Sequence, residues 1–176
     1  MRRTAFIRRG CFALGVAGLV LASVSLLAVP AWPLDTPEAR ATLKGISRLR
    51  VKVDQDTPGV DSDGLRRDQL QRDVESRLQQ AGIALADLTH AAEPLLWVVL
   101  TTDKVPEFDL YAVSIKVALF QYVRLWRSSE RGAPAATWEL EAVGSVPSQE
   151  PSELRTWVRD FVDRFIAAYH DQNPKK

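Results

Sequence analysis

The pattern of apolar and polar positions predicts four strands and two helices along the chain. Residues 45–54 and 137–146 alternate between apolar and polar side chains, which is typical of strands with one buried face. Residues 95–101 are apolar at almost every position, as expected for a central strand covered on both faces. The longest predicted strand spans residues 110–127, and seven of its odd-numbered positions from Tyr111 to Leu125 are apolar, which predicts a core face that continues to Leu125.

Two further segments carry apolar side chains at helical spacing. The first spans residues 65–81, follows the polar cluster 61–64 as a candidate N-cap, and ends before Gly82. The second spans residues 153–169 and ends before Asn173 and Pro174. Two pairs of opposite charge lie four positions apart on the polar face of the first helix: Asp68 with Arg72, and Asp73 with Arg77.

The order strand, helix, strand, strand, strand, helix predicts an α+β fold. We expect a two-layer sandwich in which a mixed sheet of about four strands carries both helices on one face, preceded by an N-terminal hydrophobic helix. The helical crossover makes the first two strands parallel. A loop through residues 128–134 joins the last two strands as an antiparallel hairpin. A domain of this size buries enough surface to fold without disulfides or cofactors.

The start of the chain has the features of an export signal. Four arginines occur in the first nine residues, and an uncharged run rich in Leu, Val and Ala follows at residues 11–29. The alternative is an uncleaved anchor, because a 19-residue helix reaches roughly 29 Å, close to the hydrocarbon thickness of a bilayer. Small residues dilute the run, and Pro30 and Pro33 end it, which favours cleavage near Ala31.

This leader determines the predicted domain boundaries and location. We expect a signal peptide or membrane anchor over residues 1–31, a tether over 32–44, the α+β domain over 45–172 and a short tail over 173–176. The protein is then periplasmic or otherwise exported. If the leader is retained, the protein is also tethered to the inner membrane and contacts it through residues 11–29.

Charge and cysteine content narrow the range of partners. With the four leader arginines set aside, 19 basic residues face 22 acidic residues, so the rest of the chain has no electrostatic reason to bind nucleic acid. The single cysteine, Cys11, lies in the leader, so the exported domain can form no internal disulfide. Arg8, Arg9 and Gly10 precede it in place of the small apolar residues of a lipid-attachment site.

Candidate catalytic and metal-binding groups are sparse. His90 and His170 stand far apart in the sequence, and neither has an acidic or histidine neighbour at a ligand spacing. Asp160 and Asp163 lie beside arginines, which favours surface ion pairs over acid–base catalysis. The glycines form no phosphate-binding loop, and no Gly-x-Ser-x-Gly motif occurs. We therefore expect a protein that is not an enzyme and has no cofactor and no metal.

The even-numbered face of the longest strand is the candidate binding surface, because it becomes aromatic toward its end. Aromatic and arginine side chains are enriched where proteins bind one another, and they also suit an anionic amphiphile. The expected partner is therefore an envelope protein, a second copy of this chain or a lipid; alternatively, another segment of the chain covers this face. The candidate residues are Phe120, Tyr122, Arg124 and Trp126 of the longest strand, and Arg48, Arg50 and Lys52 of the first strand.

Five segments carry a resemblance to known proteins: GISRLRVKV (45–53), LQRDVESRLQQAGI (70–83), TW (137–138), FVDRFIAAY (161–169) and NPK (173–175). Together they resemble a family of small exported bacterial proteins of unknown function. More loosely, the element order is similar to the lipopolysaccharide-assembly lipoprotein of the outer membrane and to the amino-terminal domains of TolB-like proteins. The resemblance implies a non-catalytic envelope adaptor. We thus predict an exported binding or assembly protein, with a periplasmic carrier of a lipid or other small amphiphile as the alternative.

Overall fold

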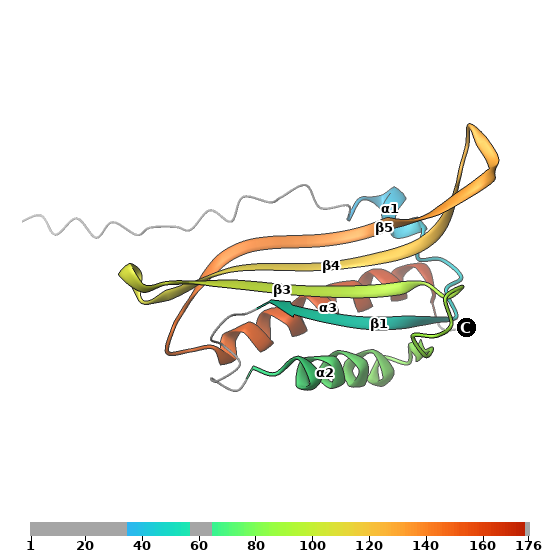
Figure 1. Cartoon of the computed structure of the whole chain (residues 1–176). Helices are drawn as coiled ribbons and strands as arrows, with labels where there is room; N and C mark the ends of the chain where they lie inside the picture. Colours follow the sequence, from blue (N-terminus) through green and yellow to red (C-terminus); the bar gives the residue numbers. More distant parts are fainter. Residues whose placement is uncertain (1–34, 57–64, 175–176) are drawn as a thin grey trace, which may run out of the picture.

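The structure, a computed structural model, describes residues 35–56 and 65–174 (Figure 1). The predicted leader, its hydrophobic helix and the polar cluster 61–64 lie outside the described residues. The described part contains three α-helices, one 3-10 turn and five strands. The helices are α1 (Pro37–Ala41), α2 (Arg67–Gln80) and α3 (Ser152–Gln172), and the 3-10 turn is η2 (Pro106–Phe108). The strands are β1 (Arg48–Asp56), β2 (Ala84–Leu85), β3 (Leu95–Val105), β4 (Leu110–Leu125) and β5 (Ser128–Pro147).

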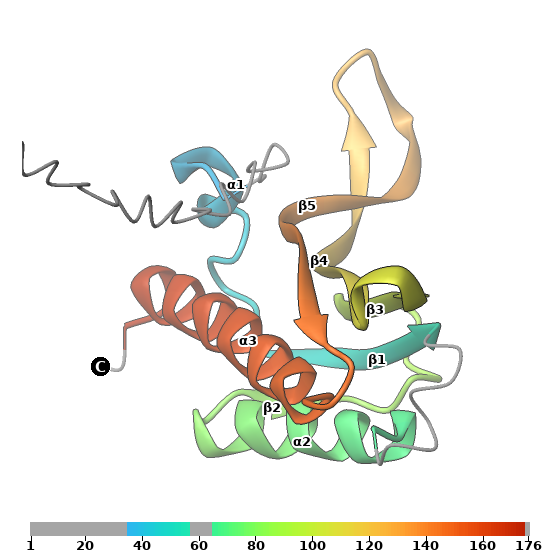
Figure 2. The ribbon, with the colours of Figure 1, turned by 90° about the vertical axis from the view of Figure 1, so that its left-hand side faces the viewer.

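The strands form one mixed sheet in the order β2-β1-β3-β4-β5. β1 is parallel to β2 and β3, whereas β4 is antiparallel to both of its neighbours, β3 and β5. Both α2 and α3 lie against the same face of the sheet (Figures 1 and 2). The predicted α+β class and mixed sheet are confirmed. The sheet has five strands rather than about four, because the two-residue β2 is too short to produce a periodic pattern.

The hydrophobic core lies between the sheet and the helices. Along one row of the sheet, Val51, Leu96, Leu119 and Trp138 occupy neighbouring positions, and all four are buried. The odd-numbered face of β4 is core up to Leu119, as predicted, but Leu125 is 41% exposed. The prediction of a continuous core face to the end of β4 is therefore wrong, because the end of β4 extends beyond the helices and the central sheet.

The other face of the sheet is not covered by a second layer in the described structure. On β3, Leu96, Val98 and Leu100 are buried, whereas Leu95 and Trp97 on the opposite face are only half-buried. The prediction that this strand is covered on both faces is therefore wrong. Its apolar residues on the far side instead form part of a partly exposed surface.

The described part of the predicted tether folds onto the domain. Thr36 caps the short helix α1, and the fully buried Leu43 follows this helix. The side chain of Asn173 closes this region from the other end of the chain. Its Oδ1 accepts from the Gly45 N–H at 2.7 Å, and its Nδ2 donates to the Leu43 carbonyl at 2.9 Å. Residues before the first long strand and after α3 are thus fastened to each other.

Asp35 fixes α1 to β5. Its carboxylate accepts two hydrogen bonds of 2.7 Å from Arg40 and one of 2.8 Å from the indole N–H of Trp138. Burial alone would raise the pKa of Asp35, but the hydrogen bonds from Arg40 and Trp138 and the charge of Arg40 outweigh it and lower the pKa. The ionised carboxylate therefore stabilises the fold.

This network predicts a pH-dependent stability. A lowered folded-state pKa gives stability that is present above the unfolded pKa of about 4 and is lost as pH falls toward the folded value. We expect Asp35→Asn to cost about 1 to 3 kcal/mol at pH 7, and the difference from wild type to shrink below about pH 4. Urea unfolding of both proteins between pH 7 and pH 3 measures this; a difference that stays constant over that range would contradict it.

Two ion pairs connect the long helices α2 and α3. The predicted pair of Asp68 and Arg72 is present, with 3.1 Å between Oδ2 and Nη1. The predicted pair within α2 between Asp73 and Arg77 is wrong, because both side chains reach across to α3. Asp73 pairs with Arg155 at 2.5 Å, and Arg77 pairs with Asp163 at 2.6 Å.

Candidate binding surfaces

The predicted binding surface divides into two separate parts. The first residue of β3, Leu95, pairs with Phe120 of β4. After Phe120, β4 therefore no longer pairs with β3. From Gln121 to Leu125, β4 pairs only with β5. We call residues 121–135 the hairpin extension, and Figures 1 and 2 show it projecting away from the body of the domain. We call the sheet face opposite the helices the open face.

An apolar stripe crosses the centre of the open face. Trp97 and Phe120 contact each other with ring centroids 5.6 Å apart and planes tilted by 54°. Both rings are half-buried, and the register places Lys52 and Ala118 on either side of Trp97. The stripe consists of Leu95, Trp97, Val99, Ala118 and Phe120.

Trp97 is held in place from the β1 side. Its indole N–H donates to Asp54 at 2.8 Å, and the Lys52 ammonium lies 5.4 Å from the ring centroid. Lys52 also donates to Asp54 at 2.7 Å. The hydrogen bond from Lys52, helped by that from Trp97, lowers the pKa of Asp54 despite its partial burial. The largest side chain of the stripe is therefore oriented in advance rather than free to rotate.

Lys52 and Asp54 form a charged row on the β1 side of the stripe, and a second charged row borders the stripe on the β5 side. The Lys116 ammonium lies 3.1 Å from Glu141 and 3.3 Å from Glu139. Burial would lower the pKa of Lys116, but these two carboxylates raise it above its ordinary value. Sequence reasoning did not select Lys116, Glu139 or Glu141, although their alternation along β4 and β5 placed them on this face.

The arginines of β1 have a structural role. Arg48 pairs with Glu93 at 2.7 Å, and Arg50 donates to the carbonyls of Glu93, Leu88 and Ala91 at 3.0 to 3.4 Å. These bonds hold the segment between β2 and β3 against β1. The structure thus brings Lys52 and Phe120 to the open face and separates them from Tyr122, Arg124 and Trp126.

The hairpin extension carries the remaining predicted residues. Residues 128–134, predicted as a loop, belong to β5, and the turn is the dipeptide Trp126-Arg127. Tyr122 is 68% exposed, and its ring lies so close to Gly132 that a Cβ there would be 2.3 Å from it. Trp126 is fully exposed at the turn. The extension therefore presents aromatic side chains to solvent from a narrow two-stranded ribbon.

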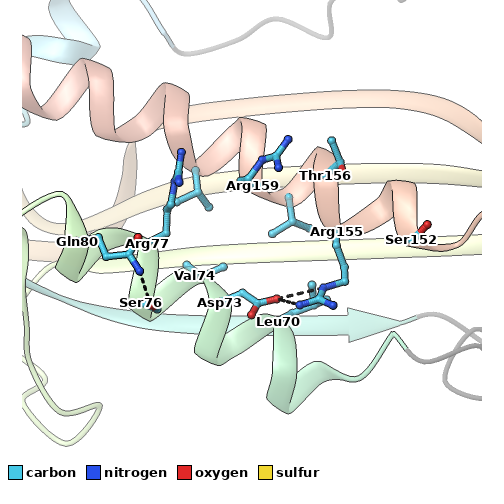
Figure 3. Close-up of a pocket in the computed structure, with 12 residues that line it drawn as sticks. Leu70, Asp73, Val74, Ser76, Arg77, Gln80, Ser152, Arg155, Thr156 and Arg159 are labelled. Atoms are coloured by element: carbon cyan, nitrogen blue, oxygen red, sulfur yellow. Dashed lines mark hydrogen bonds and ion pairs between the residues drawn. The ribbon is translucent and has the colours of Figure 1, made fainter.

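A groove between α2 and α3 was not predicted, because its walls are about eighty residues apart in the sequence. It has a volume of about 450 Å³ and an apolar floor that includes Leu70 and Val158. Figure 3 shows Asp73 and Arg155 meeting across it. Its other arginines, Arg77 and Arg159, are also paired, with Asp163 and Asp160. No arginine of this groove is thus left without a carboxylate partner among the described residues.

The described residues contain little that suggests other chemistry. No group of three or more His, Cys, Asp or Glu side chains in them is arranged to hold a metal. His90 lies in an exposed turn, and His170 packs edge-on against Tyr169 near the end of α3, with centroids 5.5 Å apart. Within the same residues, no helix combines the length and apolar character that a bilayer crossing requires.

Comparison with known proteins gives a loose structural likeness. No family model matches the chain, and no curated protein matches it. Among solved structures, the crystal structure of a minor lipoprotein from Acinetobacter baumannii is similar with a TM-score of 0.40 and 13% sequence identity. The similarity covers 74% of this chain and 95% of that chain. A likeness at this level carries no argument about function.

Proposed function

We propose that this protein is an exported, non-enzymatic binding or assembly component of the bacterial envelope, which binds a partner protein through its open face. The observation that carries the proposal is the Trp97–Phe120 stripe, half-buried and bordered by charged rows. A preformed aromatic centre with a polar rim is the arrangement found at protein interfaces. The leader supports export, because its charged start and apolar run match an export signal.

In-cell photo-crosslinking tests this proposal. A photoreactive phenylalanine analogue replaces Phe120 on the open face or, as the matched control, Phe161 on α3, which is also half-buried. We expect a discrete adduct with one envelope protein from position 120 and none from position 161. Adducts from both positions, or from neither, would refute binding through the open face, and turnover of a substrate by the purified protein would refute the non-enzymatic role.

The alternative function, a carrier of a small amphiphile, draws on the groove between α2 and α3. Its volume of about 450 Å³ is within the range of small-molecule sites. Its arginines are already neutralised by carboxylates, so an anionic head group would have to displace existing ion pairs. Native mass spectrometry separates the two functions: a carrier retains a bound amphiphile when purified, and an adaptor does not.

A further inference from the structure

We propose that the tip of the hairpin extension inserts into the surface of an anionic phospholipid bilayer. This goes beyond the proposed binding of a protein through the open face. It rests on the proposed function only because a location in the envelope would place the protein beside a bilayer. The inference starts from the shape of the extension. From Phe120 to Leu125 the ribbon projects roughly 17 Å, at about 3.3 Å per residue, beyond the last residue pair with β3.

The apolar side chains of the tip suit the interfacial region of a membrane. Trp126 is fully exposed, Tyr122 is 68% exposed and Leu125 is 41% exposed. Trp and Tyr concentrate where a bilayer meets water, because their rings are apolar and their N–H or O–H groups still reach water. Because Trp126 is fully exposed, insertion removes its ring from water at no cost in internal packing.

The charge of the tip is complementary to anionic lipid. Residues 121–135 contain three arginines and one glutamate. Arg124 and Arg127 are exposed, and neither forms an ion pair within the part of the chain that the structure describes. Their side chains are long enough to reach phosphate groups while the neighbouring rings lie deeper. Arg124 and Arg127 thus differ from Arg48 and Arg50, whose donors are used within the fold.

The arrangement favours a bilayer over a protein as the partner of this tip. The three exposed apolar side chains offer on the order of 400 Å², about half of what one partner in a stable protein interface buries. Tyr122 lies on β4, whereas Leu125 and Trp126 lie at and beyond its end, so the exposed apolar side chains are spread along the ribbon and its turn. A bilayer surrounds a tip on all sides, whereas a protein surface would contact only one side.

Quenching of tryptophan fluorescence by brominated lipid tests the proposal on the full chain. Wild type, Trp126→Ser and the matched control Phe108→Ser are mixed with phosphatidylglycerol vesicles with and without brominated acyl chains. Phe108 is 75% exposed at the opposite end of β4, so its variant reports general loss of apolar surface. The chain has five tryptophans, so we expect Trp126→Ser to lose up to one fifth of the total fluorescence from the quenched fraction seen in wild type. Phe108→Ser is expected to be quenched as much as wild type.

The contribution of charge has its own variant. Arg124→Ser combined with Arg127→Ser is expected to lower the partition of the tip from water into phosphatidylglycerol vesicles about 30-fold at low salt. Replacing phosphatidylglycerol with uncharged phosphatidylcholine should weaken the binding of wild type by a similar factor. Equal quenching in wild type and Trp126→Ser would overturn the proposal, as would equal losses in Trp126→Ser and Phe108→Ser. If Trp126→Ser instead abolished the adduct from position 120 without changing the quenching, the tip would bind protein and not lipid. The quenching is measured without any protein partner, so it can fail while the open-face function holds.

Discussion

Replacing Trp138 with alanine is expected to lower the free energy of unfolding by about 3 to 5 kcal/mol, the range for removing a large buried aromatic side chain. Trp138 is fully buried, and its ring meets Phe165 of α3 edge-on with centroids 5.2 Å apart. Its indole N–H also supplies one of the hydrogen bonds to Asp35. The substitution therefore opens a cavity where β5, α3 and the segment around α1 meet.

The matched control is Trp126→Ala. Trp126 is fully exposed, so its loss is expected to change the free energy of unfolding by no more than about 0.5 kcal/mol. Urea unfolding followed by far-ultraviolet circular dichroism measures both variants on one scale. Equal midpoints for the two variants would show that Trp138 is not a core residue, and a large loss from Trp126→Ala would show that the hairpin tip packs against something.

Elements whose burial pattern is local could be predicted from the sequence. Leu49, Val51 and Val53 alternate along β1, and all three face the helices as expected. The helical spacing of Leu70, Val74 and Leu78 likewise identified the buried side of α2. In these cases a residue's environment follows from its own neighbours in sequence, because strand and helix periodicity alone places it inside or outside.

The division of the binding surface could not be predicted in this way. The even positions of β4 continue from Phe120 to Tyr122 without a change in pattern. What separates them is the register with β3, which begins at Leu95 and therefore ends its pairing at Phe120. The register depends on contacts between distant segments, so a single strand's pattern says nothing about where its neighbour stops.

The same reason explains why the roles of the charged residues differ from expectation. The alternation of Arg48 and Arg50 with the core residues of β1 predicts a place for them on the binding surface. Their partners belong to the segment before β3, which has no periodic pattern that would place it beside β1. Asp73 pairs with Arg155 of α3, although Arg77 lies four residues away on its own helix.

Leu78→Ala is expected to cost about 2 to 5 kcal/mol of unfolding free energy, whereas Arg77→Gln, one residue earlier on α2, is expected to cost much less. Leu78 is fully buried against the sheet side of the helix. Arg77 and its partner Asp163 are 45% and 36% exposed, so water and salt screen the ion pair that joins α2 to α3. The two variants thus compare apolar packing with a surface ion pair at adjacent positions.

Comparing Leu78→Ala with Arg77→Gln shows whether apolar packing or the ion pair holds α2 against the domain. The side chain of Arg66, the N-cap residue, makes no capping hydrogen bond to the first turn of α2, and a helix of 14 residues is marginal on its own in water. Packing must therefore supply most of its stability, and Leu78→Ala should loosen α2 before the rest of the domain. The tryptophans of the described residues lie on β3, β4–β5 and α3, so circular dichroism should lose helical signal at lower urea than fluorescence changes. Coincident transitions in Leu78→Ala would mean that α2 unfolds only with the core, and a larger loss from Arg77→Gln than from Leu78→Ala would mean that the ion pair holds the helix.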